Sequence, residues 1–170
     1  HDLAILDFIL PDDCSPTGVG AYGADPIGAG RACVGFLTLP LSNGAIAHIH
    51  VNWLSPTKIR TTVLAGSRRT LVWDDLNPSQ RLSIFDRGVD LHVPADADAK
   101  RDILVSYRSG EMVAPALPET EALYASVTEF ARSVRERRQP MTDGNAGLRV
   151  VRMLETARQS LQEDGRIVSL

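Results

Sequence analysis

His1 is the side chain in this sequence that is best placed to do acid–base chemistry. It stands directly before an apolar-periodic run, residues 2–10, which predicts a short helix that ends at Pro11. The positive end of a helix dipole favours a neutral imidazole over the imidazolium. A neutral imidazole can accept a proton from a hydroxyl group near neutral pH. The alternative is that His1 is an ordinary residue at the end of a helix.

His48 and His50 are the next candidates for chemistry, because they lie two residues apart in a predicted strand. Their side chains would project from the same face of that strand, about 7 Å apart. This spacing could hold a metal ion, but no carboxylate or thiol joins the pair at a recognisable ligand spacing. We therefore predict no metal site, and expect a polar stripe at an interface or a substrate cleft.

Residues 18–23, Gly-Val-Gly-Ala-Tyr-Gly, match the dinucleotide-binding pattern G-x-G-x-x-G letter for letter. The context differs from that of a dinucleotide site, because no apolar strand leads into the glycines. The Ala-Asp-Pro-Ile-Gly that follows cannot open a helix whose N–H groups would face a pyrophosphate. We therefore predict a glycine-bearing loop or edge strand, and no cofactor-binding residue in this chain.

Two charged groups are explained more simply by local structure. Asp74 and Asp75 follow a predicted strand and precede Asn77-Pro78. Paired carboxylates could bind a cation or act as acid and base, but Asp in this position is typical of turns. The four arginines within residues 132–138 collect at the C-terminal end of a predicted helix, where the helix dipole favours cations. We interpret them as helix-end residues and not as a phosphate site.

The composition is that of an ordinary globular domain with one core. The chain has 170 residues, of which 44% are hydrophobic and 23% charged, and its net charge is -3. This charge does not favour nucleic-acid binding, and no apolar run reaches the roughly 18 residues that a membrane span needs. Cys14 and Cys33 lie far apart in the sequence. We expect two reduced thiols in a cytoplasmic protein, with a disulfide as the alternative.

Residues 31 to about 115 have the pattern of consecutive β-strands joined by short turns. A turn at residues 42–44, which contains Asn43-Gly44, joins the predicted strands 31–39 and 45–54 and is a strong hairpin signal. In the second strand, one face carries Ile46, His48, His50, Asn52 and Leu54, and the other carries Ala45, Ala47, Ile49, Val51 and Trp53. Further strands are predicted at residues 19–22, 59–64, 70–73, 81–85, 103–107, 112–114 and 166–170.

Two longer helices are predicted at residues 118–138 and 143–162. The core stripe of the first is Leu123, Val127, Phe130 and Val134, and the second is predicted to bury Leu148, Val151, Leu154 and Leu161. Together the elements predict an α+β domain, with a large, mostly antiparallel, open-faced sheet that has helices on one face. These helices cannot cover both faces of such a sheet, so we expect the other face to meet a sister subunit.

Five segments, in order, resemble the C-terminal domain of the glucose–fructose oxidoreductase / inositol dehydrogenase / MocA family. The resemblance runs through nearly all of the chain, and its force comes from the order of the segments. They are His1-Asp-Leu-Ala-Ile-Leu, residues 43–58 (Asn-Gly-Ala-Ile-Ala-His-Ile-His-Val-Asn-Trp-Leu-Ser-Pro-Thr-Lys), residues 66–78, residues 84–88 and residues 140–154.

The resemblance implies a two-domain NAD(P)-dependent oxidoreductase. In such enzymes an N-terminal Rossmann domain holds the cofactor and carries a catalytic Lys in a Glu-Lys-Pro motif. The C-terminal α+β domain supplies a wall of the substrate site and the oligomer interface. The family's catalytic His, in its D-x-x-x-H motif, falls on His1. No capping residue precedes the first helical turn. We therefore expect residues 1–170 to be a single C-terminal domain whose N-terminal nucleotide-binding domain is absent.

By this resemblance the parent protein oxidises a hydroxyl of a sugar, nucleotide-sugar or polyol with NAD or NADP, and His1 is its catalytic residue in this chain. We expect the chain alone to be inactive and to bind no cofactor. We also expect a cytoplasmic homo-oligomer formed through the sheet face, a sugar-like small-molecule substrate, and no nucleic-acid or membrane partner. The alternative is a non-catalytic dimerisation module or a sensor of a sugar or cofactor.

Overall fold

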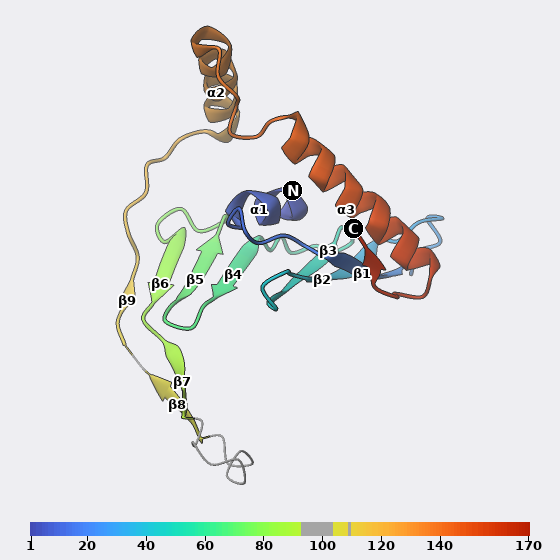
Figure 1. Ribbon diagram of the computed structural model, residues 1–170, viewed down its shortest axis with the longest axis horizontal. Helices are drawn as coiled ribbons and strands as arrows, with labels where there is room; N and C mark the ends of the chain where they lie inside the picture. Colours follow the sequence, from blue (N-terminus) through green and yellow to red (C-terminus); the bar gives the residue numbers. More distant parts are fainter. Residues whose placement is uncertain (93–103, 109) are drawn as a thin grey trace. The chain divides into compact units, whose positions relative to one another are not determined.

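The computed structural model describes residues 1–92, 104–108 and 110–170 (Figure 1). The chain divides into two compact units, the first made of residues 1–56 and 122–170 and the second of residues 57–121. The first unit contains α1 (Asp2–Ile9), β1 (Gly18–Ala24), β2 (Val34–Pro40), β3 (Ile46–Asn52), α2 (Ala122–Glu136), α3 (Gly144–Gln162) and β10 (Val168–Ser169). The second contains β4 (Thr61–Ala65), β5 (Thr70–Asp74), β6 (Leu82–Phe85), β7 (Gly88–His92), β8 (Leu104–Arg108) and β9 (Met112–Val113).

In the first unit, an antiparallel sheet with the strand order β10-β1-β2-β3 carries α1 and α3 on one face. Asn43-Gly44 makes the predicted hairpin turn between β2 and β3, and Gly44 adopts the left-handed φ of 83° that such turns favour. The core lies between this sheet and the two helices. It consists of Leu3, Val19, Ala21, Leu39, Met153 and Ala157, with Leu6, Leu37, Ala47, Ile49 and Val150 partly buried against them.

The glycine-rich segment at residues 18–23 lies in a strand, as predicted, but β1 is not an edge strand at its start. Gly18 and Val19 pair with β10 on one side, and residues 20–24 pair with β2 on the other. A Cβ on Gly18 would lie 2.8 Å from the carbonyl oxygen of Val168, which is closer than such atoms approach. The first glycine is therefore explained by the close approach of β10.

Among the residues of the second unit that the structure describes, all elements of secondary structure are strands. Its four-stranded antiparallel sheet has the order β4-β5-β6-β9, and β7 pairs with β8 in a separate two-stranded ladder. The α+β class and the antiparallel pairing are confirmed, but the strands form these separate sheets and not one large sheet. Residues 53–60 separate β3 from β4 and contain Pro56, which has no N–H group to continue a ladder.

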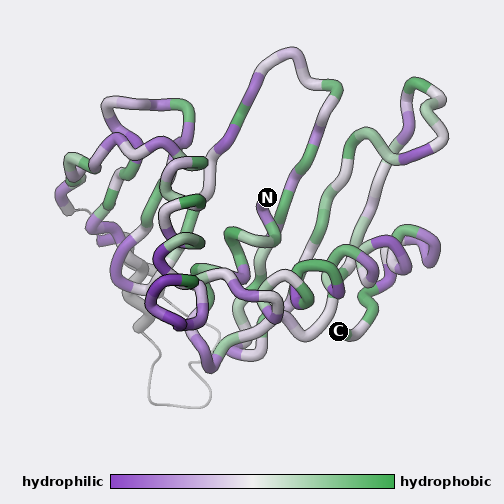
Figure 2. Tube along the Cα trace, turned by 90° about the horizontal axis from the view of Figure 1, so that it is seen from above, coloured by the Kyte–Doolittle hydropathy of each residue, from purple (hydrophilic) through white to green (hydrophobic). Residues whose placement is uncertain are grey.

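Helix α3 lies where it was predicted and α2 is shorter than its predicted range of residues 118–138, but both helices bury other residues than predicted. In α3 the buried residues are Met153, Ala157 and Ser160, whereas the predicted core residues Leu148, Val151, Leu154 and Leu161 are exposed. In α2 the predicted stripe Leu123, Val127, Phe130 and Val134 is exposed, and only Ser133 is buried. Apolar and polar residues alternate along both helical coils (Figure 2). Among the described helices, none is long and apolar enough to cross a membrane.

The direction in which α3 packs follows from the residues of β1. This strand reads Gly-Val-Gly-Ala-Tyr-Gly-Ala and presents a surface of mostly small side chains. Ala157 and Ser160 are also small, so α3 can approach the strand closely on that side. Leucines in their place would have held the helix away from the backbone of β1. Which face of α3 is buried therefore depends on the shape of the sheet surface against which the helix packs. The periodicity of the helix sequence contains no information on that shape.

Candidate functional site around helix α1

His1 lies at the start of α1, as the sequence predicted. Its main-chain carbonyl oxygen accepts the first helical hydrogen bond, from the N–H of Ile5 at 2.9 Å. Its side chain is exposed and makes no capping hydrogen bond to the helix. A residue at position 1 shares a helix face with Ala4 and Phe8, because residues three and seven positions later return to the same side. The imidazole of His1 is therefore available to a molecule bound beside α1.

An ion pair fixes α1 on α3. The guanidinium group of Arg149 donates two hydrogen bonds to the carboxylate of Asp7, with distances of 2.7 and 2.9 Å. The Asp7 side chain is only 11% exposed, and its hydrogen bonds raise the pKa of Arg149. Leu3 is buried beneath the same helix. Such a bidentate pair sets an orientation as well as a distance, so α1 and His1 have a defined position in the first unit.

Two cavities flank this ion pair, and both include Asp7 and Arg149 in their walls. One, of about 340 Å³, is an open hollow bordered by the segment after α1, by α3 and by the C-terminal Leu170, and Cys14 and Arg152 line it. The other, of about 450 Å³, lies between α1 and the start of α3, and Ala4 and Phe8 line it. Ala4 and Phe8 belong to the face of α1 that position 1 shares, but His1 itself lines neither cavity. Asp7, Arg149 and Arg152 were not among the site residues predicted from the sequence, although an Asp inside an apolar-periodic helix is a signal of a buried polar contact.

His48 and His50 lie on the face of the sheet that is turned away from α1 and α3. Their neighbours in β3, Ala47 and Ile49, pack against the core on the other face. The ring of His50 stacks on Phe36 of β2 with a centroid distance of 4.5 Å and an angle of 4°. His48 Nδ1 and Thr38 Oγ1 lie within hydrogen-bonding distance at 3.2 Å. The sequence left open which of the two stripes of this strand faces outward; in the structure the residues of the stripe from Ile46 to Asn52 face away from the helices, and Leu54 lies beyond the end of β3.

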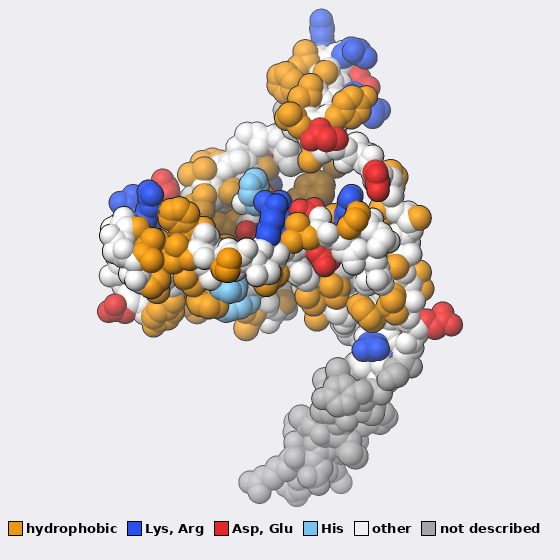
Figure 3. Space-filling model, turned by 180° about the vertical axis from the view of Figure 1, so that it is seen from behind, with side chains coloured by type: hydrophobic (Ala, Val, Ile, Leu, Met, Phe, Trp, Pro, Cys, Tyr) orange, Lys and Arg blue, Asp and Glu red, His pale blue; other side chains and the backbone are white. Residues whose placement is uncertain are grey.

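This outer face of the sheet is apolar and aromatic as well as polar. Tyr22, Phe36 and His50 form one row across β1, β2 and β3, and Tyr22, Phe36 and Ile46 are exposed. Histidine and hydrophobic side chains lie side by side on the first unit in Figure 3. Phe36 was not singled out from the sequence, because its partnership with His50 depends on the register between two strands. Exposed apolar groups mixed with polar ones are typical of interfaces.

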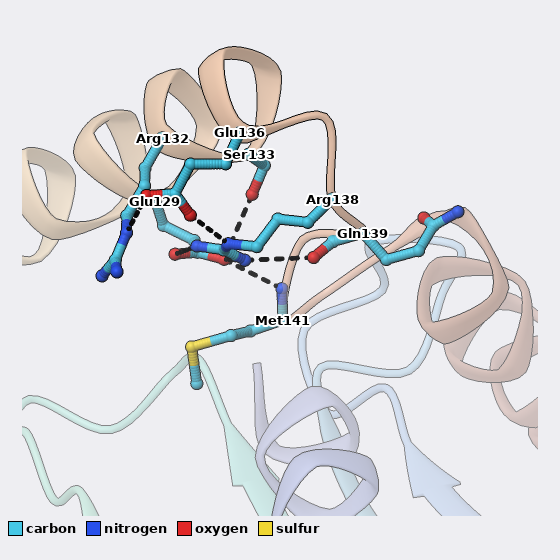
Figure 4. A network of polar contacts seen from close by, with 7 residues as sticks. All are labelled: Glu129, Arg132, Ser133, Glu136, Arg138, Gln139 and Met141. Atoms are coloured by element: carbon cyan, nitrogen blue, oxygen red, sulfur yellow. Dashed lines mark hydrogen bonds and ion pairs between the residues drawn. The ribbon is translucent and has the colours of Figure 1, made fainter.

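The remaining charged candidates form hydrogen bonds or ion pairs with nearby residues. Asp74 accepts a hydrogen bond from the N–H of Leu76, as the prediction of turn chemistry requires, whereas Asp75 forms an ion pair with Arg60 at 3.2 Å. Arg138 binds Glu129 through two nitrogens, each at 2.8 Å (Figure 4). Within the described residues, no group of three or more His, Cys, Asp or Glu side chains could hold a metal ion.

Both cysteines are buried free thiols. The Sγ atom of Cys33 lies 3.4 Å from the carbonyl oxygen of Arg31 and 3.7 Å from a carboxylate oxygen of Asp25. Burial and the negative charge of Asp25 raise the pKa of the Cys33 thiol. A thiol that is held protonated is a poor nucleophile, so Cys33 is not a reactive residue of this site.

No protein-family model matches the chain, and no curated protein matches it significantly. Solved structures do match. The UDP-N-acetylglucosamine 3-dehydrogenase GnnA from Acidithiobacillus ferrooxidans has a TM-score of 0.75 at 20% identity, over 98% of this chain and 46% of its own. The WlbA dehydrogenase from Bordetella pertussis, in complex with NADH and UDP-GlcNAcA, has a TM-score of 0.64 at 18% identity, over 100% of this chain and 42% of its own. An inositol dehydrogenase homolog complexed with NAD+, from Azotobacter vinelandii, has a TM-score of 0.61 at 15% identity, over 98% and 46%.

The chain has the fold of one part of a Gfo/Idh/MocA-type dehydrogenase. The match extends over essentially all of the chain but over less than half of each of these dehydrogenases, which is consistent with a C-terminal domain. The resemblance seen in the sequence is therefore confirmed as a resemblance of fold. It was visible as five ordered segments although the sequence identity to these structures is low.

Proposed function

We propose that this chain is the C-terminal, substrate-binding and oligomerisation domain of a two-domain NAD(P)-dependent oxidoreductase. The parent protein would oxidise a hydroxyl group of a sugar, nucleotide sugar or polyol. The observation that carries the proposal is the match of nearly the whole chain to part of several dehydrogenases, whose names include a UDP-sugar dehydrogenase and an inositol dehydrogenase homolog. The position of His1 at the start of α1, on the helix face that borders a cavity, supports it.

In this proposal His1 is the catalytic residue of the domain. Oxidation of an alcohol breaks the O–H and C–H bonds of one carbinol group and leaves a carbonyl group. The proton of the hydroxyl passes to the neutral imidazole of His1, which becomes imidazolium. NAD(P)+ bound by the nucleotide-binding domain would supply the acceptor for the hydride of the carbinol C–H bond. The ion pair between Asp7 and Arg149 keeps α1 on α3 and thereby holds His1 in place.

The G-x-G-x-x-G segment at residues 18–23 does not fit a dinucleotide. A pyrophosphate site of the G-x-G-x-x-G type needs a turn from a strand into a helix, whereas Gly18, Gly20 and Gly23 lie within β1. The backbone of this strand is paired with β10 and β2. The proposal therefore assigns the cofactor to a separate nucleotide-binding domain, together with the catalytic Lys that the family resemblance implies.

We also propose that the domain self-associates through the outer face of the sheet β10-β1-β2-β3. The exposed row of Tyr22, Phe36 and His50 supports this contact, because a two-fold axis would place these rings against their equivalents. A cytoplasmic location is proposed as well, since the free thiols of Cys14 and Cys33 suit a reducing compartment.

The test uses a longer polypeptide that joins this domain to a nucleotide-binding domain. NAD+ or NADP+ is offered to it with UDP-N-acetylglucosamine, glucose and myo-inositol, and the absorbance of the reduced nicotinamide is followed. The proposal expects substrate-dependent reduction with at least one of the three compounds. No reduction with any of them, by a protein that is folded and binds the cofactor, would favour the alternative of a non-catalytic dimerisation or sensing module.

A further inference from the structure

Helix α2 exposes a regular apolar stripe, which we call the α2 seam and define as Leu123, Val127, Phe130 and Val134. These side chains are 58–69% exposed. Their spacing of four, three and four residues is that of the apolar positions in a coiled coil. Hydrophobic side chains gather on α2 in Figure 3. A stripe of this kind on an exposed helix is typical of a surface that packs against another helix.

The polar side of α2 makes hydrogen bonds and ion pairs within the chain. Glu129 accepts hydrogen bonds from Arg138 and from the N–H of Met141, and Glu136 accepts them from Arg132 and Arg138 (Figure 4). By helical spacing, positions 129, 132 and 136 lie on the side opposite the α2 seam. The network therefore anchors the chain that leaves α2 at the back of the helix, away from the seam.

We propose that the α2 seam pairs antiparallel with the same seam of a second copy of this chain. A two-fold interface requires a surface that is complementary to itself. The spacing of the seam reads the same in both directions, so a two-fold axis between positions 127 and 130 brings Val127 opposite Phe130 of the second copy. The same axis brings Leu123 opposite Val134. A partner of another kind would not require this symmetry.

The charges along the helix also favour a second copy in the antiparallel direction. Glu119 and Glu121 precede the first turn, and no basic residue occurs between them and Glu129. Residues 129–138 carry four arginines against two glutamates. Antiparallel pairing brings the acidic start of each helix next to the basic end of the other, and it also opposes the two helix dipoles. Parallel pairing would place like charges together.

A contact between two single helices is smaller than the roughly 1,600 Å² that a stable interface usually buries. The α2 contact is therefore expected to be weaker than the proposed contact at the outer face of the sheet, but to form by itself at the tens of micromolar at which the mass is measured. Two different two-fold contacts in one chain close into a tetramer when their axes intersect at right angles, which is the arrangement proposed here. The expected size of the assembly rests on the proposed function, whereas the α2 contact itself does not.

The test is the mass of the chain in solution, measured by light scattering at tens of micromolar. The double variant V127E/F130E introduces two like charges into the α2 seam, and Phe36→Glu introduces one on the outer face of the sheet. Ala125→Glu, at an exposed position on the side of α2 opposite the seam, is the matched control. We expect a tetramer for the unaltered chain and for the control, a dimer for each of the two variants, and a monomer when the two are combined. Far-UV circular dichroism checks that every variant is folded.

The outcomes separate the two contacts. If the chain is a dimer that Phe36→Glu converts to a monomer while V127E/F130E leaves it dimeric, the α2 proposal is wrong and the sheet contact stands. If V127E/F130E alone produces the monomer from such a dimer, the sheet contact is wrong. If the α2 seam packs on α3 or on another protein instead, V127E/F130E leaves the mass of the chain unchanged. That result also overturns the α2 proposal. A monomeric unaltered chain overturns both contacts.

The direction of the pairing has its own test. Spin labels are placed at Thr128→Cys or Arg135→Cys, in a chain whose two buried cysteines are replaced by alanine. Both positions are exposed, and residues seven apart lie on the same side of a helix. With a rise of about 1.5 Å per residue, antiparallel pairing separates the two labels along the axis by about 20 Å at position 135 and about 2 Å at position 128. Electron spin resonance is expected to find the longer distance at position 135. Equal distances at the two positions would show parallel pairing and overturn the proposed arrangement.

Discussion

The hydroxyl group of Ser160 accepts a hydrogen bond from the main-chain N–H of Ala21 at 2.8 Å, across 139 positions of the sequence. The same hydroxyl donates to the carbonyl oxygen of Arg166 at 2.6 Å. Ser160 is completely buried. Strand β10 pairs with Gly18 and Val19 but does not extend to Ala21, so it offers no acceptor for the N–H of Ala21. The hydroxyl group of Ser160 from helix α3 accepts this hydrogen bond instead. One serine thus joins α3, β1 and the segment that leads to β10.

Replacing Ser160 with alanine should destabilise the first unit by about 1–3 kcal/mol, because the N–H of Ala21 would remain buried without a partner. Urea unfolding followed by circular dichroism measures this loss. The control Ser126→Ala makes the same change at an exposed position of α2 and should change the free energy of unfolding by less than about 0.5 kcal/mol. Equal effects of the two variants would show that the Ser160 hydrogen bonds contribute nothing specific.

The hydrogen bonds from Arg138 lower the pKa of Glu129 to about 2 from its ordinary value of 4.5. A carboxyl group whose pKa is lower in the folded state stabilises the fold above pH 4.5. This contribution is lost as the pH falls from 4.5 towards 2, because the unfolded chain then binds the proton first. NMR titration of the Glu129 carboxyl carbon should find its midpoint near pH 2. In Arg138→Ala the midpoint should move up towards the ordinary value, and a midpoint near 4.5 in the unaltered chain would contradict the network.

The variant His1→Ala, made in the longer enzyme of the proposed function, should lower turnover by roughly 10²- to 10⁴-fold, the usual range for a positioned acid–base group. The affinity for the cofactor should hardly change, because the proposal assigns the cofactor contacts to the other domain. Steady-state kinetics with a separate measurement of cofactor binding checks both expectations. If His1 is only a helix-terminal residue, turnover stays near that of the unaltered enzyme and only stability falls slightly.

The chain of 170 residues should fold without binding a nicotinamide cofactor. Its glycine motif lies in a paired strand and provides no free N–H groups at the start of a helix. Isothermal titration calorimetry with NAD+, NADH, NADP+ and NADPH should show no binding in the micromolar range. Micromolar affinity for any of the four would require a dinucleotide site in this domain and would overturn its assignment to a separate one.

Phe36→Glu should weaken self-association, because it places a charge in the middle of the row formed by Tyr22, Phe36 and His50. Light scattering at tens of micromolar should find half the mass of the unaltered chain. Ala29→Glu adds the same charge in an exposed loop outside this face and should leave the mass unchanged. Loss of mass in both variants would indicate a general effect of charge and no specific contact at the sheet.

The sequence by itself determined the elements of this fold and the family that it resembles. Asn43-Gly44 between two alternating runs predicted the hairpin of β2 and β3, because few residues other than glycine adopt a φ of 83° without strain. The start of α1 at His1 and the start of α3 after its N-cap Asp143 were also visible, since these signals depend only on neighbours in the chain. Strand β7 was missed.

Only the tertiary structure decided which surfaces are buried and which residues meet. Helix α3 carries apolar side chains around more than one side, and its periodicity favoured the larger ones, whereas Ala157 and Ser160 are the residues that fit against the small side chains of β1. The pairing of Asp7 with Arg149 and the stacking of Phe36 on His50 join residues from different elements. Patterns within one segment specify local conformation, but a contact between segments depends on the shape and register of both.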